Sequence, residues 1–261
     1  WSVDIRSGAD PRPRNDPNLE ELALKHDFAA DRFLCTFRGT SAAAPKITNL
    51  AGRLLSEYPD ASANLLRALI IAHAIWPPQA KELFPNEGTA VNEKIYHSYG
   101  YGRPDYEHAL HSTENFVTLI SEESIAPNES HFYEVPLPDD FLTRGRISRS
   151  ICLALAHCPP CRSTRRAYKA STISFKVVLE TDLDTVVNRF QEKSKLKNAP
   201  EWPGFIPGDQ LRSKGTAMAA RKLVSQLSSN SSLLDGKRLF VVVTQQVEDW
   251  GEELVGEQDD Y

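Results

Sequence analysis

The chain has 261 residues, of which 41% are hydrophobic and 25% are charged, and its formal net charge is -5. These proportions are typical of compact globular domains, and they exclude a fibrous repeat and a largely disordered chain. The acidic balance, with basic residues scattered along most of the chain, also argues against nucleic acid as a partner.

Residues 1–31 predict mostly loop, because they are rich in Pro, Asp, Asn and Arg and contain few apolar positions. The chain starts at Trp1 and its one methionine is Met218, so we expect the protein to extend upstream. The stretch RFLCTF at 32–37 alternates and is rich in aromatic residues, which predicts a short strand leading directly into Gly39.

Two helices are predicted next. Beyond Ala43, apolar residues recur at three- and four-residue intervals, the pattern of a helix with one buried stripe. The residues of this stripe are Ile47, Leu50, Ala51, Leu54, Leu55 and Tyr58. Pro59 ends the helix, because proline disfavours the α conformation of the residue before it. A second helix is predicted to begin at Ser62, which suits an N-cap, and to end at the Trp-Pro-Pro of 76–78.

The second predicted helix is apolar without being a membrane span. Its longest apolar run, 65–76, contains Arg67 and His73 and is well short of the length that a bilayer requires. We therefore expect no membrane partner, and we interpret His73 as a buried histidine of the helix or its end. The segment YGYGRPDYEHAL at 99–110 then predicts a glycine-rich turn and a short helix that ends near His111.

Beyond residue 112 the pattern changes to short strands separated by turn residues. Strand-like runs lie at 115–123, 131–138, 148–157, 171–180 and 237–246. Ile151, Leu153 and Leu155 share one face, which predicts a half-buried antiparallel sheet, and several such strands suggest a β-sandwich. Helical patterns at 182–193 and 215–227, on either side of a proline-bearing connection, predict an insertion of helix and loop.

Ser41 stands in an unusual setting, the stretch GTSAAAP. Gly39 allows a tight turn, the alanines after Ser41 leave the space beside its hydroxyl open, and Pro45 is expected in the first helical turn. The start of a helix also offers free N–H groups and a positive partial charge, which suit an oxyanion. A serine at a helix start is more commonly an N-cap, and that interpretation stays open beside the catalytic one.

This stretch resembles the Gly-Thr-Ser-x-Ala-x-Pro nucleophile motif of the subtilases, the subtilisin-like serine proteases. The resemblance implies that Ser41 is the catalytic nucleophile and that its backbone N–H is one oxyanion donor. It also implies that Gly39, Thr40, Ala43 and Pro45 support the turn that carries this serine. The α/β-hydrolase alternative is disfavoured, because Ala43 stands where the elbow of that family has its second glycine.

The resemblance covers residues 30–112 and implies a domain division. Residues 1–112 are then the C-terminal portion of an α/β subtilisin-like peptidase domain. Residues 113–261 would form a mainly antiparallel, jelly-roll-like β-sandwich with a helical insertion, similar to a module appended to some large bacterial subtilases.

The catalytic partners of the serine are missing from the chain. In subtilases the catalytic Asp and His precede the serine, yet no histidine here lies in the family's His-Gly-Thr setting and no aspartate in its Asp-Ser/Thr-Gly setting. The oxyanion-hole asparagine has no matching motif either. The resemblance therefore implies a serine endopeptidase, acting on polypeptide substrates without a cofactor, only when an upstream part of the same catalytic domain supplies these groups. We predict that the chain alone is inactive, and the alternative is a pseudoprotease or a protein-interaction module.

Four cysteines, at positions 35, 152, 158 and 161, are too few and too unevenly spaced for a disulfide framework, which favours a reducing compartment such as the cytoplasm. The CPPC of 158–161 could be part of a zinc or redox site. No second Cys-x-x-Cys pair exists, so we favour a hairpin loop and expect no metal. The basic stretch RSTRRAYK at 162–169 predicts a solvated hairpin end, with a docking surface for an acidic partner as the alternative.

Overall fold

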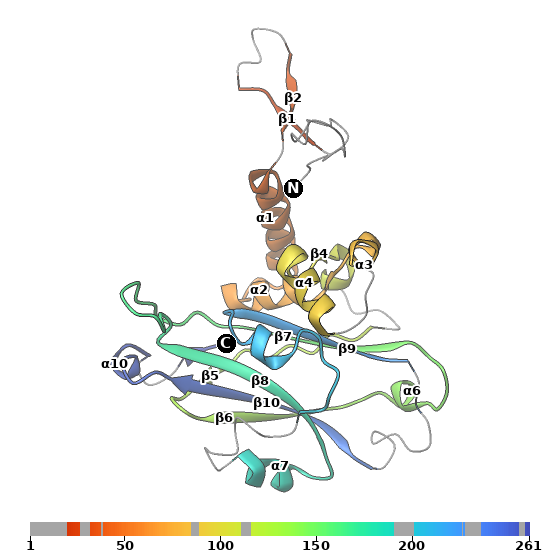
Figure 1. The fold of residues 1–261 in the computed structure, drawn as a ribbon, viewed down its shortest axis with the longest axis vertical. Helices are drawn as coiled ribbons and strands as arrows, with labels where there is room; N and C mark the ends of the chain where they lie inside the picture. Colours follow the sequence, from red (N-terminus) through yellow and green to blue (C-terminus); the bar gives the residue numbers. More distant parts are fainter. Residues whose placement is uncertain are drawn as a thin grey trace. The chain divides into compact units, whose positions relative to one another are not determined.

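The computed structural model describes residues 20–26, 32–37, 39–84, 89–110, 116–190, 201–225, 227, 236–255 and 259–261. The chain divides into two compact units, Trp1–Pro59 and Asp60–Tyr261. Helices and strands are mixed along the chain, and the strand pairs of the described ranges are all antiparallel (Figure 1). Within these ranges no helix has both the length and the apolar content needed to cross a bilayer.

A β-hairpin opens the described part of the first unit. Strand β1 (Glu21–Leu24) pairs with β2 (Leu34–Phe37), with Leu24 opposite Leu34. The strand predicted at 32–37 is thus confirmed, whereas the loop predicted over 1–31 is wrong at β1. The residues of β1 are not strong strand formers, so pairing with β2, rather than local preference, makes this segment a strand.

Helix α1 (Thr40–Glu57) follows the hairpin. It starts three residues ahead of the alanine from which a helix was predicted, and it ends, as predicted, just before Pro59. Of the predicted apolar stripe, Leu50 and Leu54 are buried, one helical turn apart, whereas Ile47 and Leu55 are 40% and 43% exposed.

The second unit begins with α2 (Ala63–Ala72), whose N-cap is Ser62, as predicted. The Ser62 hydroxyl accepts a hydrogen bond from the Leu65 amide at 3.1 Å. The predicted end of this helix at 76–78 is wrong. His73 is the C-cap, and the chain then turns into β3 (Ala74–Ile75).

Strand β3 pairs with β4 (Arg103–Pro104), and this pairing explains the early end of α2. The Asp105 amide donates to the His73 carbonyl at 2.9 Å. This carbonyl is therefore used in pairing with the β4 segment, and the backbone after His73 continues as a strand instead of a helix. Three further helices lie in this part of the chain: α3 (Pro78–Leu83), α4 (Thr89–Tyr99) and α5 (Tyr106–Leu110). The last of them is the short helix predicted after the glycine-rich turn.

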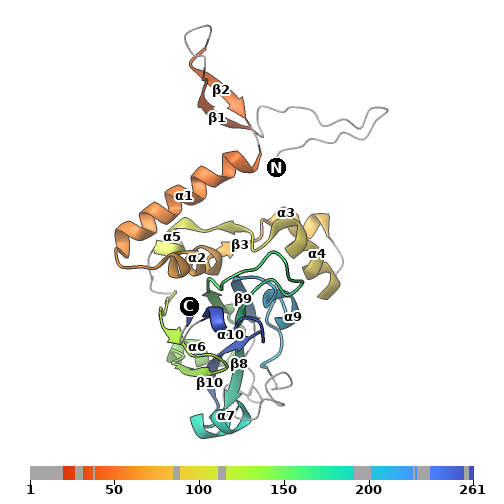
Figure 2. The same cartoon turned by 90° about the vertical axis from the view of Figure 1, so that its left-hand side faces the viewer.

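Two large antiparallel sheets dominate the described residues in the rest of the second unit (Figure 2). The three-stranded sheet has the order β6 (Ser130–Val135), β10 (Arg238–Val247), β8 (Ser171–Glu180). The two-stranded ribbon consists of β7 (Arg149–Ala156) and β9 (Ala217–Val224). The predicted strands at 131–138, 148–157, 171–180 and 237–246 are therefore confirmed. A small ladder joins β5 (Ser124–Ile125) to β11 (Asp259–Asp260).

The two sheets share one hydrophobic core. Alternate residues of β8 point into it, as do alternate residues of β10, β7 and β9. The buried strand residues of this core are Leu155, Ile173, Phe175, Val177, Met218, Ala220, Leu239, Val241 and Val243. Ile151 and Leu153 pack against it beside Leu155, which confirms the predicted apolar face of the 148–157 strand.

Two predictions about these strands are wrong. The helix predicted at 215–227 is strand β9 over most of its length, because pairing with β7 and burial of Met218 outweigh the helix preference of its Ala, Met and Lys residues. In the strand predicted at 115–123, the described residues 116–123 form no strand, and the short β5 follows them.

Short helices complete the unit: α6 (Asp139–Leu142), α7 (Leu183–Phe190), α9 (Asp209–Arg212) and α10 (Glu252–Val255). Helix α7, predicted within 182–193, packs Val186 and Phe190 on the outer face of the three-stranded sheet. Helix α2 packs on the ribbon of β7 and β9. The layers are thus α2, ribbon, three-stranded sheet and α7 (Figure 2). A mixed fold with antiparallel sheets is confirmed, while the β-sandwich interpretation and the division at residue 112 stay predictions.

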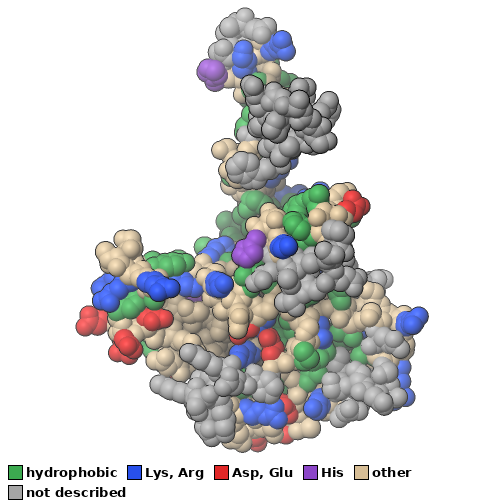
Figure 3. All heavy atoms as spheres, viewed as in Figure 1, with side chains coloured by type: hydrophobic (Ala, Val, Ile, Leu, Met, Phe, Trp, Pro, Cys, Tyr) green, Lys and Arg blue, Asp and Glu red, His purple; other side chains and the backbone are tan. Residues whose placement is uncertain are grey.

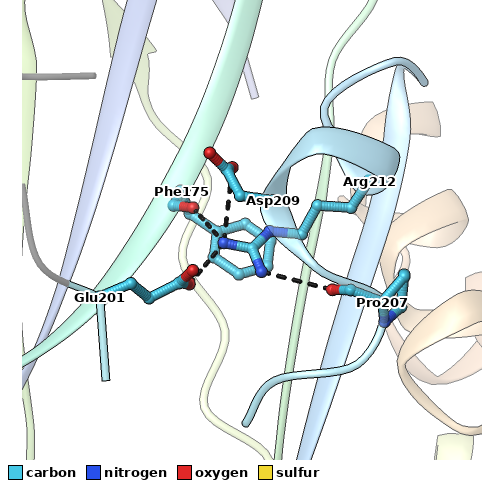
Figure 4. Close-up of polar contacts among 5 residues, drawn as sticks. All are labelled: Phe175, Glu201, Pro207, Asp209 and Arg212. Atoms are coloured by element: carbon cyan, nitrogen blue, oxygen red, sulfur yellow. Dashed lines mark hydrogen bonds and ion pairs between the residues drawn. The ribbon is translucent and has the colours of Figure 1, made fainter. Parts of the chain in front are cut away.

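A buried arginine ties the connection after residue 200 to β8 (Figure 4). The side chain of Arg212 is fully buried, with its guanidinium 4.7 Å from the centre of the Phe175 ring. It donates to the Phe175 carbonyl at 3.0 Å and forms ion pairs with Glu201 and, at 3.6 Å, with Asp209. One cation therefore joins the start of this connection to its end and to the sheet.

Candidate active site

Ser41 lies in the first turn of α1, one residue after the helix begins. Gly39 is the N-cap residue, with φ of 118° and ψ of 178°, a backbone conformation that favours glycine. The Ala42 amide closes the first turn on the Gly39 carbonyl at 3.0 Å, and no side chain caps the helix. The interpretation of Ser41 as an N-cap is therefore wrong, and its hydroxyl is free of that role.

The surroundings of Ser41 in the first unit are open. Thr40, Ser41, Ala43 and Pro45 are all exposed. Among the described residues, the Ser41 hydroxyl has no hydrogen-bond partner, and no acid or base is paired with it. The first amides of a helix lack intrahelical acceptors, so N–H groups and the positive end of the helix lie next to the hydroxyl.

Pro45 lies in the second turn of α1 and not in the first, because the helix begins at Thr40. A proline there has no N–H to offer the carbonyl four residues earlier, which is that of Ser41. The expected position of Pro45 is therefore wrong by about one turn, and its effect falls on the backbone of the serine itself.

An ion pair joins α1 to the hairpin in front of it. The Lys46 ammonium pairs with the Glu21 carboxylate of β1, and their side chains are 62% and 47% exposed. This pair could not be predicted, since Glu21 lies in a segment where only loop was expected. Exposed ion pairs contribute little stability, so this contact adds little to the stability of the hairpin.

Comparison with known proteins adds a family to this geometry. Residues 12–102 match the family model described as the subtilase family. This segment therefore belongs to that family. The matched segment contains the β1–β2 hairpin, α1 with Ser41, and α2, so the resemblance inferred from GTSAAAP is confirmed at the family level.

A curated relative of this subtilase-like chain comes from Sinorhizobium fredii and bears the name "Uncharacterized protein y4bN". The two are 31% identical over 210 residues, which is 78% of this chain and 48% of the relative. The chain thus spans about half the length of the curated relative it matches. Because the alignment is longer than the subtilase segment, it also takes in part of the sheets.

The other candidate residues lie away from the subtilase motif. Cys158 and Cys161 are free and exposed in the loop between β7 and β8, where the Cys161 thiol contacts the Pro159 carbonyl at 3.4 Å. Among the described residues, no group of three His, Cys, Asp or Glu side chains is placed to hold a metal ion. This loop is a hairpin closed by the Arg162 amide on the Tyr168 carbonyl at 2.8 Å.

The basic stretch at 162–169 is exposed up to Tyr168, as predicted for a hairpin end. Figure 3 shows Lys and Arg side chains at this edge of the second unit, with Asp and Glu side chains beside them. The Arg162 guanidinium also lies 5.5 Å from the centre of the Trp250 ring, just before α10. The alternative of a docking surface for an acidic partner stays a prediction.

Proposed function

We propose that the protein is a serine endopeptidase in which Ser41 is the nucleophile. The observation that carries the proposal is the exposed Ser41 hydroxyl, in the first turn of a helix that begins after a positive-φ glycine, within a segment of the subtilase family. A hydroxyl that caps no helix end and faces open space is available for acylation.

The reaction needs groups that other parts of the protein supply. A histidine accepts the Ser41 proton, Oγ attacks the carbonyl carbon of a peptide bond, and an acyl-enzyme forms and is hydrolysed by water. The backbone N–H of Ser41, at the positive end of α1, stabilises the oxyanion. The partners are therefore a polypeptide substrate and an upstream part of the same catalytic domain, which supplies the Asp, the His and the second oxyanion donor.

The apolar surface of the hairpin supports an upstream partner of this kind. Leu22 and Leu24 of β1 are 65% and 79% exposed. A two-stranded hairpin with uncovered apolar side chains is marginally stable alone, and the missing part of a catalytic domain would cover it.

For residues 113–261 we propose a β-sandwich module that follows the catalytic domain. The core shared by the ribbon and the three-stranded sheet supports this proposal. The four free cysteines support a reducing compartment such as the cytoplasm.

A fluorophosphonate probe on the full-length protein tests the role of Ser41. We expect labelling of the natural protein and, for Ser41→Ala, loss of labelling together with a fall in peptide hydrolysis of at least about 1,000-fold. Ser56→Ala is the matched control, because Ser56 lies on the same helix and its hydroxyl donates to the Gly52 carbonyl at 3.0 Å. Full labelling of Ser41→Ala would refute the proposal, and an unlabelled natural protein would favour the pseudoprotease.

A further inference from the structure

The contact between α2 and the ribbon of β7 and β9 is polar near the middle of the helix. Arg67 of α2 donates to the His157 carbonyl at 3.2 Å and to the Thr216 hydroxyl at 2.8 Å. The His157 amide in turn donates to the Thr216 carbonyl at 2.8 Å. One guanidinium thus joins α2 to the end of β7 and to the start of β9.

The imidazole of His157 is enclosed at this contact. Its residue is 0% exposed, and neither ring nitrogen has a hydrogen-bond partner among the described residues. The charged groups that face it are Arg67 of α2 and Lys169, from the segment before β8. The Lys169 ammonium is held by the carbonyls of residues 213–215. Both neighbours are cations, so a proton on His157 would find no counter-charge.

A second enclosed imidazole lies at the C-terminal end of the same helix. His73 is 5% exposed, its Nε2 has no partner in the described part of the chain, and its ring lies edge-on to Phe116 at 5.0 Å. The charged groups that face it are Arg221 of β9, His108 of α5 and Asp105. Asp105 is already paired with His108 at 3.0 Å.

The ribbon also holds the last carbonyls of α2. Arg221 donates to the carbonyls of Ala72 and Ala74, both at 3.2 Å, and the Cys152 thiol of β7 donates to the Ala72 carbonyl at 3.0 Å. Cys152 therefore lies directly beneath the end of the helix, where burial raises the pKa of its thiol. Its accessibility reports whether α2 is in place.

Protonation of either imidazole works against this arrangement. Burial, with a smaller contribution from the neighbouring cations, lowers the pKa of His73 and of His157 from 6.5 to about 4. If α2 leaves the ribbon and both rings meet water, both rings regain ordinary pKa values. Between pH 6.5 and 4, the form with α2 released therefore binds protons that the form with α2 docked does not. The free energy that favours the docked form falls as the pH falls through this range, and it falls no further below pH 4.

We propose that the enclosed imidazoles of His73 and His157 make the docking of α2 on the β7–β9 ribbon acid-sensitive, so that acidification releases the helix from the ribbon. The device lies wholly within the second unit and does not depend on the role of Ser41. It would separate the end of the subtilase segment from the sheets in acid conditions.

The labelling rate of Cys152 tests this release. The chain carries Cys35→Ser, Cys158→Ser and Cys161→Ser, so that Cys152 is its one thiol, and it is treated with an aromatic disulfide that stays reactive in acid. Rates between pH 7.5 and 4.5 are divided by those of the urea-unfolded chain. Each proton taken up on release raises the population of the released form by about 10-fold per pH unit. Uptake of two protons therefore predicts that the Cys152 labelling ratio rises by up to about 100-fold for each pH unit below pH 6.5.

Removal of one imidazole should reduce this rise to about 10-fold per pH unit, and removal of both should abolish it. The variants are His73→Phe, His157→Phe and their combination, with the Gln variants for any that does not fold. His97→Phe is the control, because His97 is exposed on α4 and outside the contact. The proposal is overturned if the double variant keeps the natural slope, or if the amides of β8 and β10 lose hydrogen-exchange protection together with α2.

Discussion

Gly102 sets the approach of two backbone segments in the second unit. Its φ is 107°, and a Cβ built on it would lie 2.3 Å from the Ile75 carbonyl oxygen. Both the conformation and the space therefore require glycine where β3 meets β4. The contact is with backbone, so no side-chain rotation can relieve it.

Gly102→Ala should lower the free energy of unfolding by about 3 kcal/mol, because the strain of a positive φ adds to the overlap with Ile75. Urea denaturation followed by circular dichroism measures the change. Gly208→Ala is the control, since a Cβ there meets nothing within 4 Å, and it should stay within about 1 kcal/mol of the natural protein. Equal midpoints for the two variants would contradict this account.

For single residues, the sequence identified the candidate nucleophile Ser41 but did not predict at which residue its helix begins. The identity of Ser41 and of its neighbours follows from the motif alone. The start of α1 at Thr40, and with it the position of Pro45 in the second turn, could not be predicted, because Thr40 and Ser41 suit a cap as well as a first turn. The Asp and His that would act with Ser41 could not be assigned, because no motif of this chain matches the settings in which the family carries them.

Among the connections, the one from Glu201 to Arg212 depends most on a single side chain (Figure 4). The fully buried guanidinium of Arg212 is matched by two carboxylates and two carbonyls, so its burial is compensated only while these partners remain. Removing the cation would leave the Glu201 carboxylate, 21% exposed, without its partner.

Arg212→Met should therefore cost about 3–5 kcal/mol of unfolding free energy, measured by urea denaturation. Arg238→Met is the matched control. Its ion pair with Glu134 joins side chains that are 47% and 45% exposed, and its loss should cost at most about 1 kcal/mol. Adding Glu201→Gln to Arg212→Met should restore part of the loss, and a double variant whose cost equals the sum of the single costs would argue against the pairing.

Strands β8 and β9 show which elements a sequence can predict. Residues 171–180 alternate between buried and less buried positions and are rich in β-branched and aromatic residues, so pattern and propensity agree and β8 was predicted with its observed bounds. The residues of β9 favour a helix, and only the ladder to β7 makes them a strand. Hairpin strand β1 was missed for the same reason, since its partner lies across an intervening loop.

At the scale of the whole molecule, helix α2 belongs to two descriptions of the chain. It lies within the subtilase match of residues 12–102, yet it forms the outer layer over β7 and β9. The compact unit that contains the sheets begins at Asp60, ahead of this helix. Neither boundary coincides with the change of sequence pattern at residue 112.

Residues 60–261 should therefore be more stable than residues 113–261. Without α2, the outer face of the ribbon, including Cys152 and the buried Ala219, would meet water, and Arg221 would lose its carbonyl acceptors. We expect a thermal midpoint lower by about 10 °C for the shorter fragment, measured by calorimetry. Equal midpoints would support an independent domain that starts at residue 113.

The family match and the packing of the chain thus divide this polypeptide at different places. A gene rearrangement that exchanged the C-terminal half at the point where the sequence changes character would separate the sheets from the helix that shields them. Helix and ribbon are one packing unit, so the two halves on either side of residue 112 are not interchangeable parts.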